Sequence, residues 1–198
     1  GGDVTGSVDE QVRHAISKLA HIHFPSSRES EKRLLQMGEE PWRICRISDS
    51  HLDPLILGRF RDEADVRDFF RLGEGVRPIV VLQHSETTEP EMAAIQMRET
   101  VRALQRIEER KIFIYPSTDV GVEGILSAIA EVESDPQAQI FPNVRSDLFL
   151  GLLLIARVLV GNSSCGILEA PFVGLASVNV GRRQEGRTRL GDVVDVPH

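Results

Sequence analysis

The stretch that decides the fold is Val158-Leu159-Val160-Gly161-Asn162-Ser163-Ser164-Cys165-Gly166-Ile167-Leu168-Glu169-Ala170-Pro171. An apolar run of strand length ends in a glycine, and small polar side chains and then a potential helix follow it. A strand that enters a helix through small residues places free backbone N–H groups beside the positive helix end, which suits a phosphate. The stretch has neither the Gly-Lys-Ser/Thr of a P-loop nor a Gly-x-Gly-x-x-Gly pattern. By its spacing alone, it suits an ordinary turn that binds nothing equally well.

Short apolar runs alternate with helical patterns throughout the second part of the chain. We expect strands over residues 79–82, 112–115, 138–141, 158–160, 176–180 and 193–196, with helices between them. This alternation predicts the α/β class, a doubly wound sheet with right-handed crossovers. Ligands of such sheets lie beyond the carboxyl ends of the strands. Those ends carry an imidazole, hydroxyls, amides and arginines, at His84, 116–121, 143–146, 161–164 and 181–187.

The first part of the chain is less regular. Residues 8–20 carry an apolar stripe at helical spacing, and residues 21–24 and 42–47 have strand-like composition. Ser26, with a glutamate three residues later, forms a capping-box pattern that predicts the start of a second helix. We therefore expect two helices and two short strands before the regular alternation begins.

The composition excludes several classes of function. A formal net charge of −7 argues against general nucleic-acid binding, because the phosphate backbone would be repelled. No apolar run is long enough to span a membrane. Cys45 and Cys165 are the only cysteines and lack a metal or redox spacing, so a reducing cytoplasm is the simplest setting. His21 and His23 share a strand face without a third ligand nearby, so we expect no metal and no cofactor.

A series of motifs covers nearly the whole chain. In order, they are Gly1-Gly2-Asp3-Val4-Thr5-Gly6-Ser7-Val8-Asp9-Glu10, Arg13-His14-Ala15-Ile16-Ser17-Lys18-Leu19-Ala20-His21, Leu82-Gln83-His84 with Thr87-Thr88, Tyr115-Pro116 with Asp119 and Gly121, Gly161-Asn162-Ser163-Ser164-Cys165-Gly166 with Glu169, and Gly181 with Arg183-Gln184 and Gly186-Arg187. In this order they resemble the UDP-N-acetylglucosamine 2-epimerases of the hydrolysing, sialic-acid-pathway type. The non-hydrolysing relatives usually open the first helix differently, with a Pro-Glu-Glu run.

The resemblance implies a Rossmann-like doubly wound parallel sheet within a two-domain glycosyltransferase-B-type fold, which holds its substrate between the domains. Residues 1–76 would be the C-terminal part of the first domain and a linker. Residues 77–198 would be most of the second, UDP-binding domain. Further acidic catalytic positions would lie upstream of this chain, so we expect the chain alone to be inactive. We also expect a homo-oligomer, with UDP-N-acetylglucosamine and UDP as ligands and with no nucleic-acid or membrane partner.

The activity that the resemblance implies is conversion of UDP-N-acetylglucosamine to N-acetylmannosamine and UDP. The sugar loses its C2 proton and expels UDP from C1, and the unsaturated sugar then takes up water. A base and an acid are needed for these steps. Asp9, Glu10 and His84 match catalytic positions of the family, and either Asp9 or Glu10 would face the substrate. Arg13 matches a basic position suited to a phosphate or to holding that carboxylate.

The resemblance also implies a set of residues that bind UDP. These are Asn143, Arg145, Ser163, Ser164, Gly166, Glu169 and Arg183. The two serines would donate to the diphosphate, Glu169 would accept the ribose hydroxyls, and Arg183 would lie near the nucleotide. Asn143 and Arg145 lie where a loop on the uracil side is expected, in a segment that departs from the usual pattern.

Simpler interpretations remain open for several of these residues. Asp9 and Arg13 would also form an ordinary ion pair on a solvated helix. Asp119 would serve as a helix cap, and Cys165 as a small packed residue rather than a nucleophile. The whole chain is also compatible with the same chemistry on a UDP-2,4-diacetamido-trideoxyhexose, or with a UDP-sugar-binding module that is non-catalytic or belongs to a glycosyltransferase.

Overall fold

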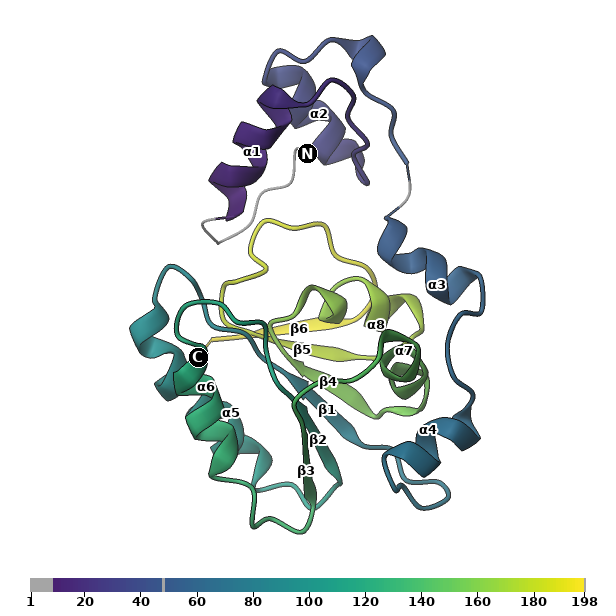
Figure 1. Cartoon of the computed structure of the whole chain (residues 1–198), viewed down its shortest axis with the longest axis vertical. Helices are drawn as coiled ribbons and strands as arrows, with labels where there is room; N and C mark the ends of the chain where they lie inside the picture. The colour runs from purple at the N-terminus through teal and green to yellow at the C-terminus, as the bar shows by residue number, and fades with distance from the viewer. Residues whose placement is uncertain (1–8, 48, 198) are drawn as a thin grey trace.

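The protein is built on one six-stranded parallel sheet. The computed structural model describes residues 9–47 and 49–197. The strand order is β3-β2-β1-β4-β5-β6, and every neighbouring pair is parallel (Figure 1). The strands are β1 (Ile79–Leu82), β2 (Lys111–Ile114), β3 (Ala138–Phe141), β4 (Val158–Gly161), β5 (Ser177–Val180) and β6 (Val193–Val196). The prediction of a doubly wound parallel sheet is therefore confirmed, with the order that Rossmann-like folds share.

Helices cover both faces of this sheet. The helices of the described residues, including two that lie away from the sheet, are α1 (Asp9–Leu19), α2 (Arg28–Gln36), α3 (Asp53–Ile56), α4 (Glu63–Phe69), α5 (Ala93–Leu104), α6 (Val122–Ala130), α7 (Ser146–Ile155) and α8 (Glu169–Phe172). Short 3-10 turns lie at η1 (Pro41–Arg43), η2 (Ser50–Leu52), η3 (Pro90–Met92) and η4 (Ser164–Gly166). Within the described residues, no helix has the length and apolarity needed to cross a membrane.

Alternation along the strands divides the hydrophobic core into two layers. Ile79 and Val81 of β1 join a core layer with the apolar sides of α5 and α6. Val80, between them, points to the opposite layer, which α4 and α7 cover. Successive side chains of a strand point to opposite faces, so a strand buried on both sides must be apolar throughout. This is why the strand runs of the sequence are continuous rather than alternating.

The chain order reverses between β1 and β4, and a glycine permits the contact there. Leu82 of β1 pairs with Gly161 of β4. Gly161 has φ = 140°, and a Cβ atom on it would lie 2.0 Å from the Leu82 carbonyl oxygen. Only glycine fits this position. Strand order of this kind opens a crevice beyond the carboxyl ends of the two central strands.

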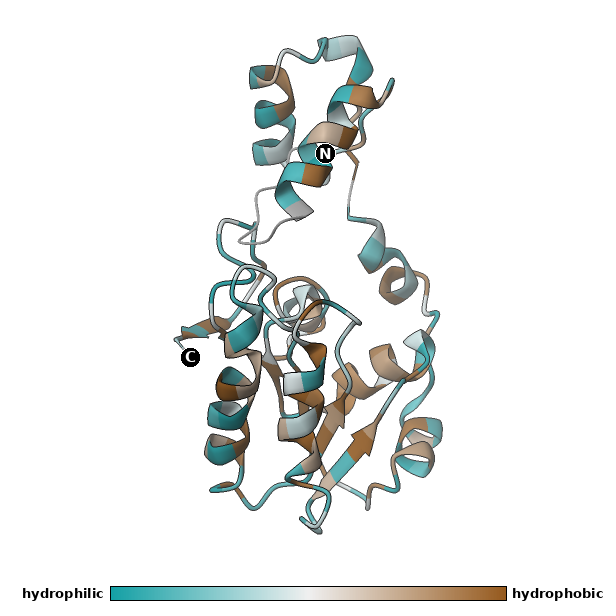
Figure 2. Cartoon of the chain, turned by 60° about the vertical axis from the view of Figure 1, so that its left-hand side comes forward, coloured by the Kyte–Doolittle hydropathy of each residue, from teal (hydrophilic) through white to brown (hydrophobic). Residues whose placement is uncertain are grey.

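The first two helices form a small lobe beyond the carboxyl ends of the strands (Figure 1). Its centre is the buried carboxylate of Glu39, which contacts Lys18 at 2.7 Å, His23 at 3.1 Å and Arg43 at 3.3 Å. Lys18 lowers the pKa of Glu39 most, and burial acts against it. Leu19 and Trp42 are exposed apolar residues of the lobe. Figure 2 shows hydrophobic and hydrophilic positions mixed along the helices of the lobe.

Two expectations for this lobe and its neighbours are corrected. Residues 42–47 do not form a strand, because η1 occupies the start of the segment and only one bridge, between His23 and Ile44, is present. The cap of α2 is Ser27, not Ser26, and its hydroxyl accepts from the Ser30 N–H at 3.1 Å. Residue 8, the expected helix start, lies outside the described residues.

Residues between the lobe and β1 pack against the sheet. Leu55 of α3 and Val66 and Phe70 of α4 belong to the same core layer as Val80. α4 also packs against α7. The division into residues 1–76 and 77–198 stays a prediction, and the core of the sheet draws on side chains from both sides of it.

Candidate functional site

The site is centred on a reciprocal pair of hydrogen bonds between the ends of β1 and β4. The backbone N–H of His84 donates to Asn162 Oδ1 at 2.6 Å, and Asn162 Nδ2 donates to the His84 carbonyl at 2.9 Å. Asn162 is completely buried. A buried amide that satisfies both backbone groups of one residue fixes that residue firmly. Asn162 therefore sets the position of His84 at the reversal of strand order.

The loop after β2 holds the imidazole of His84. The Ser117 N–H donates to His84 Nδ1 at 3.2 Å, and Ser117 Oγ lies 2.9 Å from the same nitrogen. Ser117 Oγ donates to Asp119 Oδ2 at 2.8 Å. Burial and then the positive charge of Arg183 lower the pKa of His84 to about 4, while Asp119 acts in the opposite direction. The ring is therefore neutral at neutral pH.

The loop after β5 closes the site from the other side. Gln184 Nε2 donates to the Asn162 carbonyl at 2.7 Å, and Arg183 Nη1 approaches the same oxygen at 3.5 Å. Arg183 Nη2 lies 3.7 Å from Asp119 Oδ2. The buried carboxylate of Glu86 accepts the Arg182 N–H at 2.7 Å. Loops after four different strands thus meet around His84 and Asn162, and this convergence is the geometry expected of a ligand edge.

The segment after β4 differs from the expected single helix. It forms η4 and then, separately, the four residues of α8, so Glu169 begins α8 instead of lying within a longer helix. Gly166, in η4, leaves its carbonyl as an acceptor for the Ser177 hydroxyl. Ser163 and Ser164 are half-buried and directly follow Asn162. The phosphate argument for these serines therefore depends on loop N–H groups and hydroxyls, because a helix this short has little dipole.

The carboxylate of Glu169 has an acceptor oxygen that a hydrogen-bond donor of a ligand could use. Its Oε2 is buried and has no hydrogen-bond partner among the residues that the structure describes. Burial raises the pKa of Glu169, whereas the charges of His51 and Arg187 lower it and that of Asp49 raises it. An unpaired buried carboxylate oxygen costs free energy unless a ligand supplies a donor. Ribose hydroxyls would be such donors.

Cys165 is a packed residue. It is buried, and burial is the main cause that raises the pKa of its thiol to about 12. A thiol of this kind is not a nucleophile at neutral pH. The interpretation of Cys165 as a small core residue is consistent with this position.

Other predicted residues lie apart from this cluster. Arg145 is exposed and contacts Asp147 at 2.8 Å, and Asn143 lies on the same exposed loop after the edge strand β3. Glu10 contacts His14 at 3.8 Å on α1, in the lobe. Arg13 lies on α1 as well, and the side chain of Asp9 lies outside the described part of the structure. No contact between any of these residues and His84 is present in the described part of the chain.

Sequence reasoning missed three residues that build the site. Asn162, Ser117 and Gln184 all contact His84 or its amide partner, yet none had an assigned role. A buried amide after a strand at the reversal of order was the available signal for Asn162. Asp119 is not a side-chain cap, because α6 begins after Gly121 without one, and its carboxylate instead accepts from Ser117.

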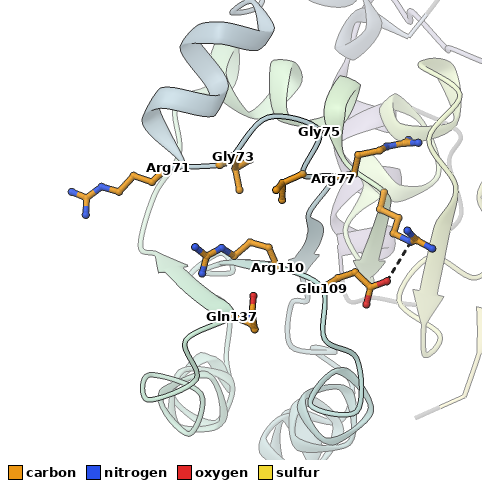
Figure 3. Close-up of a pocket in the computed structure, with 10 residues that line it drawn as sticks. Arg71, Gly73, Gly75, Arg77, Glu109, Arg110 and Gln137 are labelled. Carbon is orange, nitrogen blue, oxygen red and sulfur yellow. Dashed lines mark ion pairs between the residues drawn. The ribbon is translucent and has the colours of Figure 1, made fainter.

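A pocket of about 440 Å³ lies at the opposite, amino edge of the sheet (Figure 3). Its arginines make interactions within the fold. Arg77 donates a hydrogen bond to the Ala156 carbonyl at the end of α7, at 3.0 Å. Arg157 faces Glu109 at 3.8 Å. In Figure 3, the side chains of Arg71 and Arg77 point away from one another. Arginine at a helix C-terminus stabilises the negative end of the helix, so this pocket needs no ligand to explain it.

The comparisons with known proteins identify the family to which the chain is similar. The family model for UDP-N-acetylglucosamine 2-epimerase matches residues 1–198. A UDP-N-acetylglucosamine 2-epimerase of Neisseria meningitidis is 37% identical over 94% of this chain and 49% of its own length. The hydrolysing UDP-N,N'-diacetylbacillosamine 2-epimerase of Legionella pneumophila is 34% identical over 99% of this chain and 52% of its own length.

Solved structures support the fold. The N. meningitidis UDP-GlcNAc 2-epimerase bound to UDP-GlcNAc matches with a TM-score of 0.73 and 14% identity, over 87% of this chain and 47% of that chain. The Methanocaldococcus jannaschii enzyme, solved with UDP-GlcNAc and UDP, matches with a TM-score of 0.70 and 16% identity, over 95% of this chain and 53% of that chain. The prediction of a Rossmann-like, glycosyltransferase-B-type sheet is confirmed.

The matches extend over only part of each related protein. The chain spans about half the length of the curated relatives that it matches. Its own residues, however, are covered from end to end by the family model. The chain belongs to the UDP-N-acetylglucosamine 2-epimerase family.

Proposed function

We propose that this chain is the UDP-binding part of a hydrolysing UDP-N-acetylglucosamine 2-epimerase, which releases N-acetylmannosamine and UDP. The observation that carries the proposal is the meeting of three loops around His84, Asn162 and Arg183 at the reversal of strand order. Membership in the family supports the ligand class. A reducing cytoplasm as the setting and a homo-oligomer as the assembly are further proposals.

The reaction needs two stages. In the first, a carboxylate takes the C2 proton and the C1–O bond breaks, so that UDP leaves with the bonding electron pair. In the second, water adds across the resulting double bond, with hydroxyl at C1 and hydrogen at C2, on the face that gives N-acetylmannosamine. The sum is substrate plus water giving the free sugar plus UDP, which requires no oxidant and no cofactor.

Each proposed residue has a part in these stages. Asp9 or Glu10, on the first helix of the lobe beyond the strand ends, would be the base, assisted by Arg13 (Figure 1). His84 would stabilise the departing UDP, because its uncharged ring can donate a hydrogen bond to a phosphate oxygen. Replacing His84 with alanine should lower kcat about a hundredfold while UDP affinity changes much less.

The nucleotide would lie along the carboxyl edge. Ser163 and Ser164 would donate to the diphosphate, and Arg183 would neutralise part of its charge. Glu169 would accept the ribose hydroxyls through its unpartnered Oε2. Asn143 and Arg145 remain proposed contacts on the uracil side, and Gly166 would allow the backbone to approach the nucleotide.

A second substrate is favoured by one observation. The L. pneumophila relative, which acts on UDP-N,N'-diacetylbacillosamine according to its name, is nearly as similar as the N. meningitidis relative. The same chemistry would apply, because the two sugars share the acetamido group at C2 and the UDP at C1. Kinetics with both substrates on the longest polypeptide that contains this chain would separate them by their kcat/KM values.

Turnover in heavy water tests the proposal directly. The longest polypeptide that contains this chain should release UDP and place deuterium at C2 of the free sugar. Recovery of intact substrate would contradict the proposal. Transfer of the sugar to an acceptor without exchange at C2 would instead indicate a glycosyltransferase.

A further inference from the structure

His84 is held on one side by a single residue. Both the N–H and the hydroxyl of Ser117 approach Nδ1 of the ring, at 3.2 and 2.9 Å. The loop that carries Ser117 fits tightly against the end of β1, since Gly121 has φ = 91° and a Cβ on it would lie 2.6 Å from Ser85 Oγ. The position of Ser117 relative to the ring is therefore well determined.

The backbone contact decides which ring nitrogen carries the hydrogen. A backbone N–H can only donate, so Nδ1 must accept, and the neutral ring then holds its hydrogen on Nε2. The hydroxyl of Ser117 is compatible with this arrangement, because its one hydrogen can rotate between Nδ1 and the Asp119 carboxylate. Asp119 thus reaches His84 through Ser117 and not directly.

The other ring nitrogen is open. Across residues 9–47 and 49–197, Nε2 of His84 has no hydrogen-bond partner and is not among the buried polar atoms that lack one. It therefore reaches solvent at the carboxyl edge, where the loops after β1, β2, β4 and β5 meet. The charged groups that face the ring are Arg183, from the loop after β5, and Asp119, from the loop after β2.

We propose that Ser117 is the positioning residue of His84: it keeps Nδ1 as an acceptor, so that Nε2–H is presented as a neutral hydrogen-bond donor to an anionic ligand. His84 then cannot be the base that removes the C2 proton. The identity of the anion, the departing diphosphate, depends on the proposed function, whereas the state of the ring does not.

Nitrogen-15 NMR of the imidazole tests the state of the ring without any activity. In the longest polypeptide that contains this chain, near neutral pH, Nε2 should give a protonated, pyrrole-like signal and Nδ1 a pyridine-like signal. A hydrogen on Nδ1, or on both nitrogens, would overturn the proposal. This outcome would leave the proposed epimerase activity standing, while a correct tautomer in a protein without epimerase activity would refute only the function.

Kinetics test the role of Ser117. Ser117→Ala removes the hydroxyl but keeps the N–H that makes Nδ1 an acceptor, so kcat should fall about fivefold to tenfold with KM nearly unchanged, while Nε2 stays protonated. Ser117→Thr should restore the rate. Thr118→Ala, at the exposed neighbouring position, is the control and should match wild type. A wild-type kcat in Ser117→Ala, or a hydrogen on Nδ1 in that variant, would contradict the positioning role.

Discussion

Polar side chains lie at both the carboxyl and the amino edge of the sheet, but the two edges differ in how far the hydrogen-bonding groups are satisfied within the fold. At the amino edge, Arg77 and Arg110 donate to the backbone carbonyls of Ala156 and Pro136, so their hydrogen bonds are used within the fold. At the carboxyl edge, Oε2 of Glu169 is buried and has no partner within the described parts of the chain. Pockets of similar volume, about 440 and 410 Å³, lie at the amino edge and beside the ends of β5 and β6 at the carboxyl edge, so pocket volume does not distinguish the two edges. The unused hydrogen-bonding capacity at the carboxyl edge does.

Removing Asn162 should give the largest effect at the carboxyl edge. Asn162→Ala leaves the N–H and carbonyl of His84 without their partners, which should cost about 3 kcal/mol of unfolding free energy and abolish UDP binding. Asn162→Asp keeps the acceptor but sets a buried carboxylate oxygen against the His84 carbonyl, so its loss should be at least as large. Urea denaturation and calorimetry would measure both. Equal stability of Asn162→Ala and wild type would contradict the central position of this amide.

Low pH should lower the unfolding free energy through protonation of His84. The folded-state pKa of His84 is about 4 against an ordinary value of 6.5, so the unfolded chain binds this proton more readily. The resulting stability is fully present above pH 6.5 and is lost as pH falls toward 4, by about 3 kcal/mol in total. His84→Gln should show a flatter dependence of unfolding free energy on pH in this range. An unchanged slope in that variant would show that the ring is not held neutral.

A substitution of Glu169 should change ligand binding without disrupting the fold. Glu169→Ala should weaken UDP binding about tenfold, because two hydroxyl contacts would be lost, while the fold remains intact. The variant should be at least as stable as wild type, since it removes a buried oxygen without a partner. Calorimetric titration with UDP gives the affinity, and an unchanged Kd would remove the ribose assignment.

The smallest effect is expected at the amino edge. Arg77→Ala should lower the unfolding free energy by about 0.5 kcal/mol, because one interaction with the end of α7 is lost. UDP affinity should stay at the wild-type value. A marked loss of UDP binding in Arg77→Ala would remove the distinction between the two edges.

Local patterns predicted much of this architecture. The six strands and the helices α5, α6 and α7 follow from continuous apolar runs and from helical spacing, which are properties of neighbouring residues. The structure of the segment after β4 was harder to predict, because Gly166 and Pro171 interrupt a helix that the apolar residues of this segment favour. The expected strand over residues 42–47 failed for a similar reason, since Pro41 begins a 3-10 turn there.

The site itself depends on contacts that no local pattern contains. His84 and Asn162 are 78 positions apart in the chain, and Ser117 reaches the ring from a third loop. The fold predicted that these loops would share an edge, and the resemblance supplied His84 and Arg183. Neither could show that an amide would join two strands or that a serine would set the ring nitrogen.

Crystallography with UDP tests the central claim most directly. The longest polypeptide that contains this chain, crystallised with UDP, should hold the diphosphate between His84 Nε2, Ser164 and Arg183, with the ribose at Glu169. The arginine-lined pocket at the amino edge should remain without nucleotide. Nucleotide density in that pocket, with an empty carboxyl edge, would contradict the account.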